Sequence, residues 1–225
     1  MEDGWTMIPI LYEDNHLLVV VKPKNIPVQA DDSKDPDLLT LLKSDLKERY
    51  QKPGNVYLGL IHRLDRPVSG VMVFAKTSKA ASRLSEQVRT HQFEKNYYAV
   101  IEGNIEKKEG TWKDYLLKDS KTNTVHVDKN GKEAILDYKV VETVDSYSLV
   151  KIALKTGRSH QIRVQFSSRG YPLYGDQRYN KNAKAGEQIA LYAYKLSFYH
   201  PISKERVSFE NSLPNTYPWN LFHKN

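Results

Sequence analysis

Short apolar runs separated by turn residues constrain the fold of this chain more than any other feature of its sequence. The longest apolar stretches, such as Leu17–Val21, have the length of a β-strand. They fall far short of the roughly 18 consecutive apolar residues that a membrane-spanning helix needs. We therefore expect a sheet-rich globular protein without a membrane segment. The acidic start, Met1–Trp5, lacks the basic and apolar regions of a secretory signal, so we expect a cytoplasmic protein.

Two segments have the apolar spacing of helices. Asp35-Pro36 has the pattern of an N-cap followed by proline at the first helical position, and leucines then recur every three or four residues. This pattern predicts a helix over 36–49. A second helix is predicted over 79–91, where apolar residues after Thr77-Ser78 share one face. The segment 161–166 fits a strand and a helix equally well.

Strand composition marks several further segments, at 17–21, 70–75, 97–102 and 148–155. Asn130-Gly131 is a strong turn signal and predicts a hairpin over 125–138. The lysine-rich stretch 107–132 has no strong apolar period, which indicates further hairpins and loops. Hairpins are more evident than strand–helix–strand units, so the pattern favours an α+β fold with a largely antiparallel sheet. Because the 225 residues contain no repeat and no low-complexity linker, we expect a single domain over 1–225.

Composition narrows the possible chemistry. The chain has no cysteine, which excludes disulfide frameworks, thiolate metal sites and thiolate nucleophiles. Its 34 lysines and arginines exceed its 27 acidic residues, and the resulting net charge of +7 favours a polyanionic partner such as nucleic acid. An acidic lipid surface is the competing partner, but the sequence has no long basic amphipathic helix that would lie on one.

The densest cluster of reactive side chains is His62-Arg63-Leu64-Asp65-Arg66-Pro67. The Asp65 carboxylate is flanked by two arginines and a histidine, and Pro67 and Gly70 force a turn before the next strand. A loop that leads into a rigid strand suits a catalytic group. From spacing alone, a surface ion pair between Asp65 and Arg63 or Arg66 is the alternative interpretation.

This cluster, continued through Val68-Ser69-Gly70, resembles the H-R-L-D-x-x-T-S-G signature of the RluA-type RNA pseudouridine synthases. Five further segments resemble motifs of that family in the same order, namely Lys22-Pro23 with Val28-Gln29, Lys95–Val100 with Gly103, Thr156–Val164, Gly170–Asp176, and Leu191–Ala193 with His200-Pro201. The resemblance covers about residues 17–201. Asn25, Val68 and Tyr192 stand where the family usually has glycine, threonine and histidine. Only about sixteen residues precede the first motif, so we expect no N-terminal S4 domain.

The resemblance implies a long mixed, mostly antiparallel sheet flanked by helices, with an active-site cleft across its middle. It implies an isomerase that converts uridines of structured ribosomal or transfer RNA to pseudouridine, with Asp65 as the catalytic carboxylate. Arg158 is the expected ionic partner that keeps Asp65 charged, and Tyr97 is the expected base that removes the C5 proton. Asp65 could attack C1′ of the ribose or start glycal formation, and the sequence leaves both routes open.

The reaction needs no cofactor, because it breaks the C1′–N1 bond and joins C1′ to C5 without any redox change. Substrate or RNA contacts are expected at eight further positions, namely Lys22, His62, Arg63, Arg66, Lys95, His160, Arg163 and Leu191. Arg63 either pairs with Asp65 or fills the space that the target nucleotide leaves. Exposing a stacked uridine costs a few kcal/mol and least in loops, which favours stem-loop substrates.

Three other expectations complete the interpretation. His62, His160 and His200 lack the ligand pattern of zinc deaminases, so we expect no metal. Asp176 is a candidate second carboxylate for glycoside hydrolysis, but its place beside Gly175 indicates a residue that braces a loop. We expect a monomer. A noncatalytic RNA-binding or RNA-folding factor is the alternative function, although binding alone does not require Asp65, Tyr97 and Arg158 together.

Overall fold

The computed structural model describes residues 7–223, which divide into two compact units. Unit 1 consists of Met1–Phe93 and Lys195–Asn211, and unit 2 consists of Glu94–Tyr194 and Ser212–Asn225. The described residues contain an 11-stranded sheet and three α-helices. The expected α+β class with a mostly antiparallel sheet is therefore confirmed, while a single domain over 1–225 and a central cleft stay predictions.

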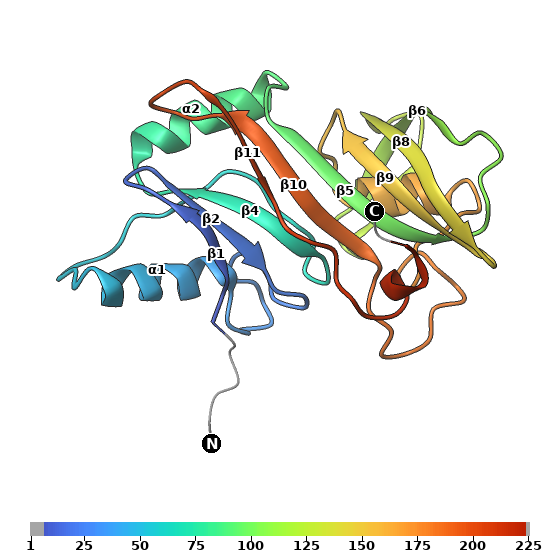
Figure 1. Ribbon diagram of the computed structural model, residues 1–225, viewed down its shortest axis with the longest axis horizontal. Coiled ribbons are helices and arrows are strands. Elements are labelled where there is room, and N and C mark those ends of the chain that lie inside the picture. The colour runs from blue at the N-terminus through green and yellow to red at the C-terminus, as the bar shows by residue number, and fades with distance from the viewer. Residues whose placement is uncertain (1–6, 224–225) are drawn as a thin grey trace. The chain divides into compact units, whose positions relative to one another are not determined.

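In unit 1, three antiparallel strands lie side by side in the order β1 (Ile10–Glu13), β2 (Leu17–Lys22) and β4 (Ser69–Ala75), as Figure 1 shows. The short β3 (Gly59–Leu60) pairs with β4. The second half of β10 (Leu191–Tyr199) pairs with β11 (Arg206–Glu210). Apolar residues of β2 and β4 are buried against those of the helix α2 (Ser78–Arg89) and of β10. The continuous apolar runs of the sequence thus form the core of unit 1.

The two helices of unit 1 begin at side-chain caps. The helix predicted over 36–49 is α1 (Leu38–Arg49). It begins later than predicted because Asp37, rather than Asp35, is the N-cap and accepts a hydrogen bond from the Thr40 amide. The predicted second helix is α2, which begins one residue early, after the Thr77 hydroxyl caps the Ala80 amide. Both predicted helices are confirmed, and only their ends differ.

In unit 2, five antiparallel strands follow the order β5 (Glu94–Glu102), β9 (Tyr147–Leu154), β8 (Lys132–Val144), β6 (Glu109–Asp119) and β7 (Thr124–Val127). The ambiguous segment is the helix α3 (Gln161–Ser167). Its residues Gln161–Phe166 are all buried, and polar and apolar side chains alternate along them, so the sequence shows no helical period. A short 3₁₀-helix, η1 (Trp219–Leu221), packs through Trp219 against Val100 of β5 and Leu149 of β9.

The hairpin predicted over 125–138 is wrong. A turn does occur there, since the Gly131 amide donates to the Asp128 carbonyl, but the strands on its two sides do not pair with each other. β7 and β8 instead flank β6, and β7 forms a hairpin with the end of β6. The connecting chain therefore passes close to the β6 backbone: a Cβ atom on Gly131 would lie 2.4 Å from the Leu116 carbonyl carbon.

No helix within residues 7–223 combines the length and the apolar character that crossing a membrane requires.

Candidate active site

Asp65 lies in the loop between β3 and β4 of unit 1. The Asp65 carbonyl accepts a hydrogen bond from the Val68 amide at 2.9 Å, which closes a tight turn through Pro67. The Asp65 side chain is half-buried. At the start of the loop, the buried His62 ring accepts a hydrogen bond at Nε2 from the Val73 amide of β4, 3.1 Å away. His62 thus fastens the start of the loop to the strand that follows it.

Lys22, at the end of β2, holds the other side of the same loop. Its side chain is fully buried, and its ammonium donates to the carbonyls of Pro23, Arg66 and Val68 at 3.0, 2.9 and 2.7 Å. Burial lowers the pKa of Lys22 to about 7, although the negative charge of Asp65 acts in the opposite direction. Its three donors are directed at backbone carbonyls inside the protein, and the contact of Lys22 with RNA stays a prediction.

The two arginines of the loop differ in their surroundings. Arg63 is exposed. Arg66 reaches the loop that precedes α1, where its guanidinium forms ion pairs with Asp31 at 3.6 Å and with Asp35. The same loop begins after Asn25, whose φ of +62° is a conformation that glycine adopts without strain and asparagine tolerates. This explains how asparagine fits at a position where glycine is expected.

Tyr97 and Lys95 lie on β5 of unit 2. Tyr97 is 6% exposed, and its Cα pairs with that of Ile152 on β9. Lys95 points against the backbone of the loop before α3, where a Cβ on Gly157 would lie 2.6 Å from the Lys95 Nζ. Burial lowers the pKa of Lys95. Gly157 is therefore the residue that lets this ammonium approach the loop of Arg158.

Arg158 is exposed, and its Nε donates to the Glu133 carbonyl of β8 at 2.7 Å. The loop that carries it is organised by Gln161, whose side-chain oxygen accepts hydrogen bonds from the Arg158 amide at 3.0 Å and the Thr156 hydroxyl at 2.8 Å. The Gln161 amide group donates to the Ile135 carbonyl. Sequence reasoning gave Gln161 no role, although it lies inside the quoted motif Thr156–Val164.

The start of α3 is also fixed by buried polar contacts. His160 has a φ of +53°, and its Nδ1 lies 2.6 Å from the hydroxyl of Tyr179. The same hydroxyl accepts a hydrogen bond from the Val125 amide of β7 at 2.9 Å, so Tyr179 connects the start of α3 to β7. Tyr179 is a second residue that sequence reasoning missed, and no motif quoted above includes it.

Arg163 forms a buried ion pair with Asp176. Its Nε and Nη2 donate to the two carboxylate oxygens at 2.9 and 2.8 Å, and the two side chains are 6% and 0% exposed. Both of these guanidinium nitrogens are committed to Asp176, and the contact of Arg163 with RNA stays a prediction. The prediction that Asp176 braces a loop is confirmed, since it also accepts hydrogen bonds from the amides of Arg178 and Tyr179.

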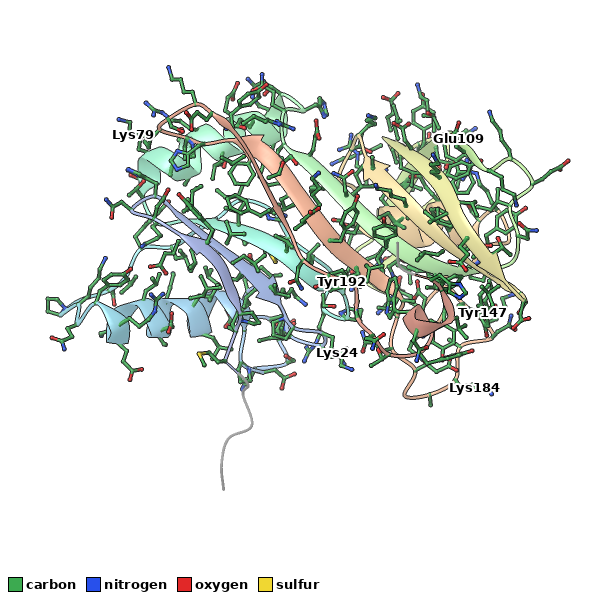
Figure 2. All side chains as sticks on the ribbon, viewed as in Figure 1. Lys24, Lys79, Glu109, Tyr147, Lys184 and Tyr192 are labelled. Atoms are coloured by element: carbon green, nitrogen blue, oxygen red, sulfur yellow. The ribbon has the colours of Figure 1, made fainter. Side chains whose placement is uncertain are left out.

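The remaining predicted contacts are placed as follows. Leu191 is buried at the start of β10. The next residue, Tyr192, is labelled in Figure 2 and belongs to the same apolar cluster as Val100 and Trp219. Within residues 7–223, no group of three histidine or acidic side chains is arranged to hold a metal ion.

Asp65 belongs to unit 1, whereas Tyr97 and Arg158 belong to unit 2. The meeting of these three side chains stays a prediction, as do the RNA contacts of His62, Arg63, Arg66, Lys95, His160 and Leu191.

Comparison with known proteins decides the family of this loop and its surrounding fold. The profile of the family described as "RNA pseudouridylate synthase" matches residues 16–168, which include β2, the Asp65 loop and α3. The chain belongs to this family, and it is of the RluA type. As an RNA pseudouridine synthase it is an intramolecular isomerase, so the predicted reaction class is confirmed.

Two curated relatives show how far the likeness of this pseudouridine synthase extends. The "Uncharacterized RNA pseudouridine synthase YhcT" of Bacillus subtilis is 34% identical over 211 residues, which cover 92% of this chain and 69% of the relative. The "Ribosomal large subunit pseudouridine synthase D" of Zymomonas mobilis is 33% identical over 222 residues, with the same two shares.

A solved structure supports the fold. The structure titled "Human RNA Pseudouridylate Synthase Domain Containing 4" superposes with a TM-score of 0.77 at 24% sequence identity, and the match covers 92% of this chain and 88% of that one. The pseudouridine synthase fold predicted from the motifs is therefore confirmed.

Proposed function

We propose that this pseudouridine synthase isomerises specific uridines of structured ribosomal or transfer RNA, with Asp65 as its catalytic carboxylate and without a cofactor. The observation that carries the proposal is the construction of the Asp65 loop. His62 ties its start to β4 and Lys22 ties its end to β2, while the Asp65 side chain between them is only half-buried. A carboxylate held in this way is preorganised yet accessible to a substrate.

The proposed roles follow from the bonds that change. The C1′–N1 bond of the uridine breaks, the uracil turns, and C1′ joins C5. Asp65 either attacks C1′ or removes a proton to form a glycal. The new C–C bond leaves an extra proton on C5, which Tyr97 removes, and N1 gains a proton. Arg158 favours the ionised form of Asp65, which both routes require. No electron is gained or lost.

The names of two relatives favour ribosomal RNA as the substrate of this chain. The relative from Zymomonas mobilis and one from Vibrio cholerae are both named for the ribosomal large subunit. We therefore place ribosomal RNA before transfer RNA among the proposed substrates. The proposed enzyme is cytoplasmic and monomeric, and it acts on stem-loops. Arg63 is proposed to enter the RNA beside the flipped uridine, since it is exposed and lies two residues before Asp65.

Release of tritium from RNA labelled at C5 of uridine tests this proposal. We expect release from large-subunit ribosomal RNA fragments that contain stem-loops, and a slower reaction or none with the same sequences made fully double-stranded. Transfer RNA transcripts labelled in the same way serve as the second substrate class. Tight binding to all of these RNAs without release would instead support the noncatalytic RNA-binding factor. Mapping pseudouridines in cells with and without the gene then identifies the target uridine.

A further inference from the structure

Four aspartates lie within residues 31–37, at the end of the loop that joins β2 to α1. Two of them form ion pairs with Arg66, the residue that directly follows Asp65. The whole chain carries a net charge of +7, so a local excess of negative charge at this place is unexpected. Because carboxylates repel the phosphates of RNA, this acidic loop (residues 31–37) opposes RNA binding beside the proposed catalytic carboxylate.

Three oxygen atoms of the acidic loop surround the outer nitrogens of the Arg66 guanidinium. Nη1 lies 3.6 Å from an Asp31 carboxylate oxygen and donates to the Ser33 hydroxyl at 3.2 Å, and Nη2 forms an ion pair with Asp35. A guanidinium is a planar fork of donors that fits carboxylates and phosphates equally. The acidic loop therefore offers Arg66 an arrangement of oxygens that a phosphate of RNA can replace.

The ion pairs of Arg66 are open to water. The side chains of Arg66, Asp31 and Asp35 are 39%, 44% and 50% exposed. Ion pairs at such exposure add little to stability, because water screens them and because ordering both side chains costs entropy. Arg66 can thus exchange its carboxylate partners for another anion at small cost. The buried pair of Arg163 and Asp176 has no such freedom.

The acidic loop also keeps its shape through contacts of its own. The Asp31 carboxylate accepts hydrogen bonds from the amide and the hydroxyl of Ser33, and that hydroxyl accepts one from the Asp35 amide. The Lys34 amide donates to the Asp31 carbonyl. Release of Arg66 from the two carboxylates therefore frees a guanidinium and leaves this turn in place.

We propose that Arg66 is a binding site for a phosphate of the RNA backbone, and that Asp31 and Asp35 occupy this site in the free protein in place of that phosphate. RNA displaces both carboxylates when it binds, so the acidic loop lowers the affinity for RNA and selects against RNAs that make few other contacts. Because Arg66 directly follows Asp65, the phosphate belongs to the reacting uridine or to a nucleotide near it. This proposal rests on the proposed function, since it requires RNA to bind at the Asp65 loop.

The RNA affinity of Asp31→Asn/Asp35→Asn tests the proposal. Asparagine keeps the shape and one acceptor oxygen of each side chain but carries no charge. We expect the Kd for a labelled RNA stem-loop with uridines in its loop to fall about fivefold, the most that an exposed ion pair is commonly worth. Fluorescence anisotropy measures the Kd, and thermal denaturation followed by circular dichroism checks that the variant is folded.

Asp35→Asn and Asp32→Asn form a matched pair of single substitutions, because each removes one negative charge from the acidic loop. Asp32 is exposed, and the ion pairs of Arg66 within residues 7–223 do not include it. At about 0.1 M salt we expect Asp32→Asn to change the Kd by less than about twofold, since salt screens a charge that acts only from a distance. Asp35→Asn should tighten binding by clearly more than this.

The same substitutions in an Arg66→Gln background identify the partner of the two carboxylates. Without the guanidinium, neutralising Asp31 and Asp35 frees no cation for a phosphate. We therefore expect Asp31→Asn/Asp35→Asn to change the Kd of Arg66→Gln by no more than about twofold, so that the two sets of substitutions are strongly non-additive.

Three results would overturn this inference. They are equal tightening by Asp35→Asn and Asp32→Asn, a Kd of Asp31→Asn/Asp35→Asn no lower than that of wild type, and an undiminished gain in the Arg66→Gln background. Slower tritium release at saturating RNA without tighter binding would show that the ion pairs brace the Asp65 turn, and it would also overturn the inference. None of these results bears on the proposed function, which fails instead if Asp65→Asn isomerises uridine normally.

Discussion

Arg163 and Lys22 show that a basic residue in a motif can be committed to the protein interior. Both were expected to contact RNA, and in the structure both hold polar groups of the protein, Asp176 in one case and three carbonyls in the other. Arg158, in the same motif as Arg163, is exposed, and so is Arg63 beside Asp65. Sequence spacing cannot make this distinction, because it shows which charges are near one another along the chain but not which of them water reaches.

The buried ion pair predicts a large loss of stability when one partner is removed. Arg163→Met leaves the Asp176 carboxylate buried without its bidentate partner, and breaking such a pair costs about 3 to 5 kcal/mol in the free energy of unfolding. Urea denaturation measures this change. Arg89→Met is the control, since its ion pair with Glu86 is exposed to water and its loss should change the stability little. Equal effects of the two substitutions would contradict the description of the Arg163 pair.

The buried ammonium predicts a pH dependence of stability. Burial lowers the pKa of Lys22 to about 7, while a lysine in the unfolded chain keeps its proton up to about pH 10.4. Between these values the unfolded state binds more protons, so the contribution of Lys22 makes the free energy of unfolding rise with pH. The stability of wild type relative to Lys22→Met should therefore increase from about pH 7 to pH 10 in urea titrations. A constant difference would show that Lys22 keeps its ordinary pKa.

At the scale of the element, the connection between β7 and β8 is the feature that the sequence predicted wrongly. Asn130-Gly131 does form a turn, but the glycine is needed because its backbone passes against that of Leu116 on β6. Gly131→Ala should therefore destabilise the protein by about 1 to 3 kcal/mol, as overpacking does. Gly54→Ala is the matched control, because nothing lies within 4 Å of its added Cβ. Thermal denaturation of both variants checks this, and a neutral Gly131→Ala would mean that β6 is not so close.

Elements with a clear apolar period were predictable, and their details depended on contacts that no local pattern shows. The helices α1 and α2 and the strands β2 and β4 all appear where the sequence predicted them. The choice of Asp37 over Asp35 as N-cap was not evident, because Asp35 is taken by Arg66 from a distant loop. The helix α3 stayed ambiguous because Gln161–Phe166 are all buried, so their polar and apolar side chains do not separate onto an exposed and a buried face.

For the candidate site, the motifs predicted the Asp65 loop, the tyrosine of β5 and the arginine before α3 in advance. They did not predict the supports of these residues. Gln161 and Tyr179 organise the Arg158 loop and the start of α3 through hydrogen bonds to segments far away in the sequence. Such partners are set by tertiary packing, so a single sequence identifies the group that acts more readily than the groups that hold it.

At the scale of the whole molecule, the net charge of +7 predicts salt-dependent RNA binding. If about three phosphates of single-stranded RNA are contacted, raising monovalent salt from about 50 to 200 mM should weaken binding roughly 20-fold, because counterions are released on binding. Filter binding or fluorescence anisotropy at several salt concentrations measures this slope. Arg163→Met should show the wild-type slope, since its charge is buried in an ion pair. A salt-independent Kd would leave the excess of basic residues without a role in RNA binding.

The central claim is that one carboxylate, on a turn fixed to two strands, performs the isomerisation. Asp65→Asn tests it most directly, because the amide keeps the shape of the side chain but carries neither the charge nor the basicity of a carboxylate. Single-turnover release of tritium from C5-labelled RNA should fall to the uncatalysed rate, while the Kd for the same RNA stays within about twofold of wild type. Release by Asp65→Asn at a rate near that of wild type, with the same RNA and equal binding, would contradict the claim.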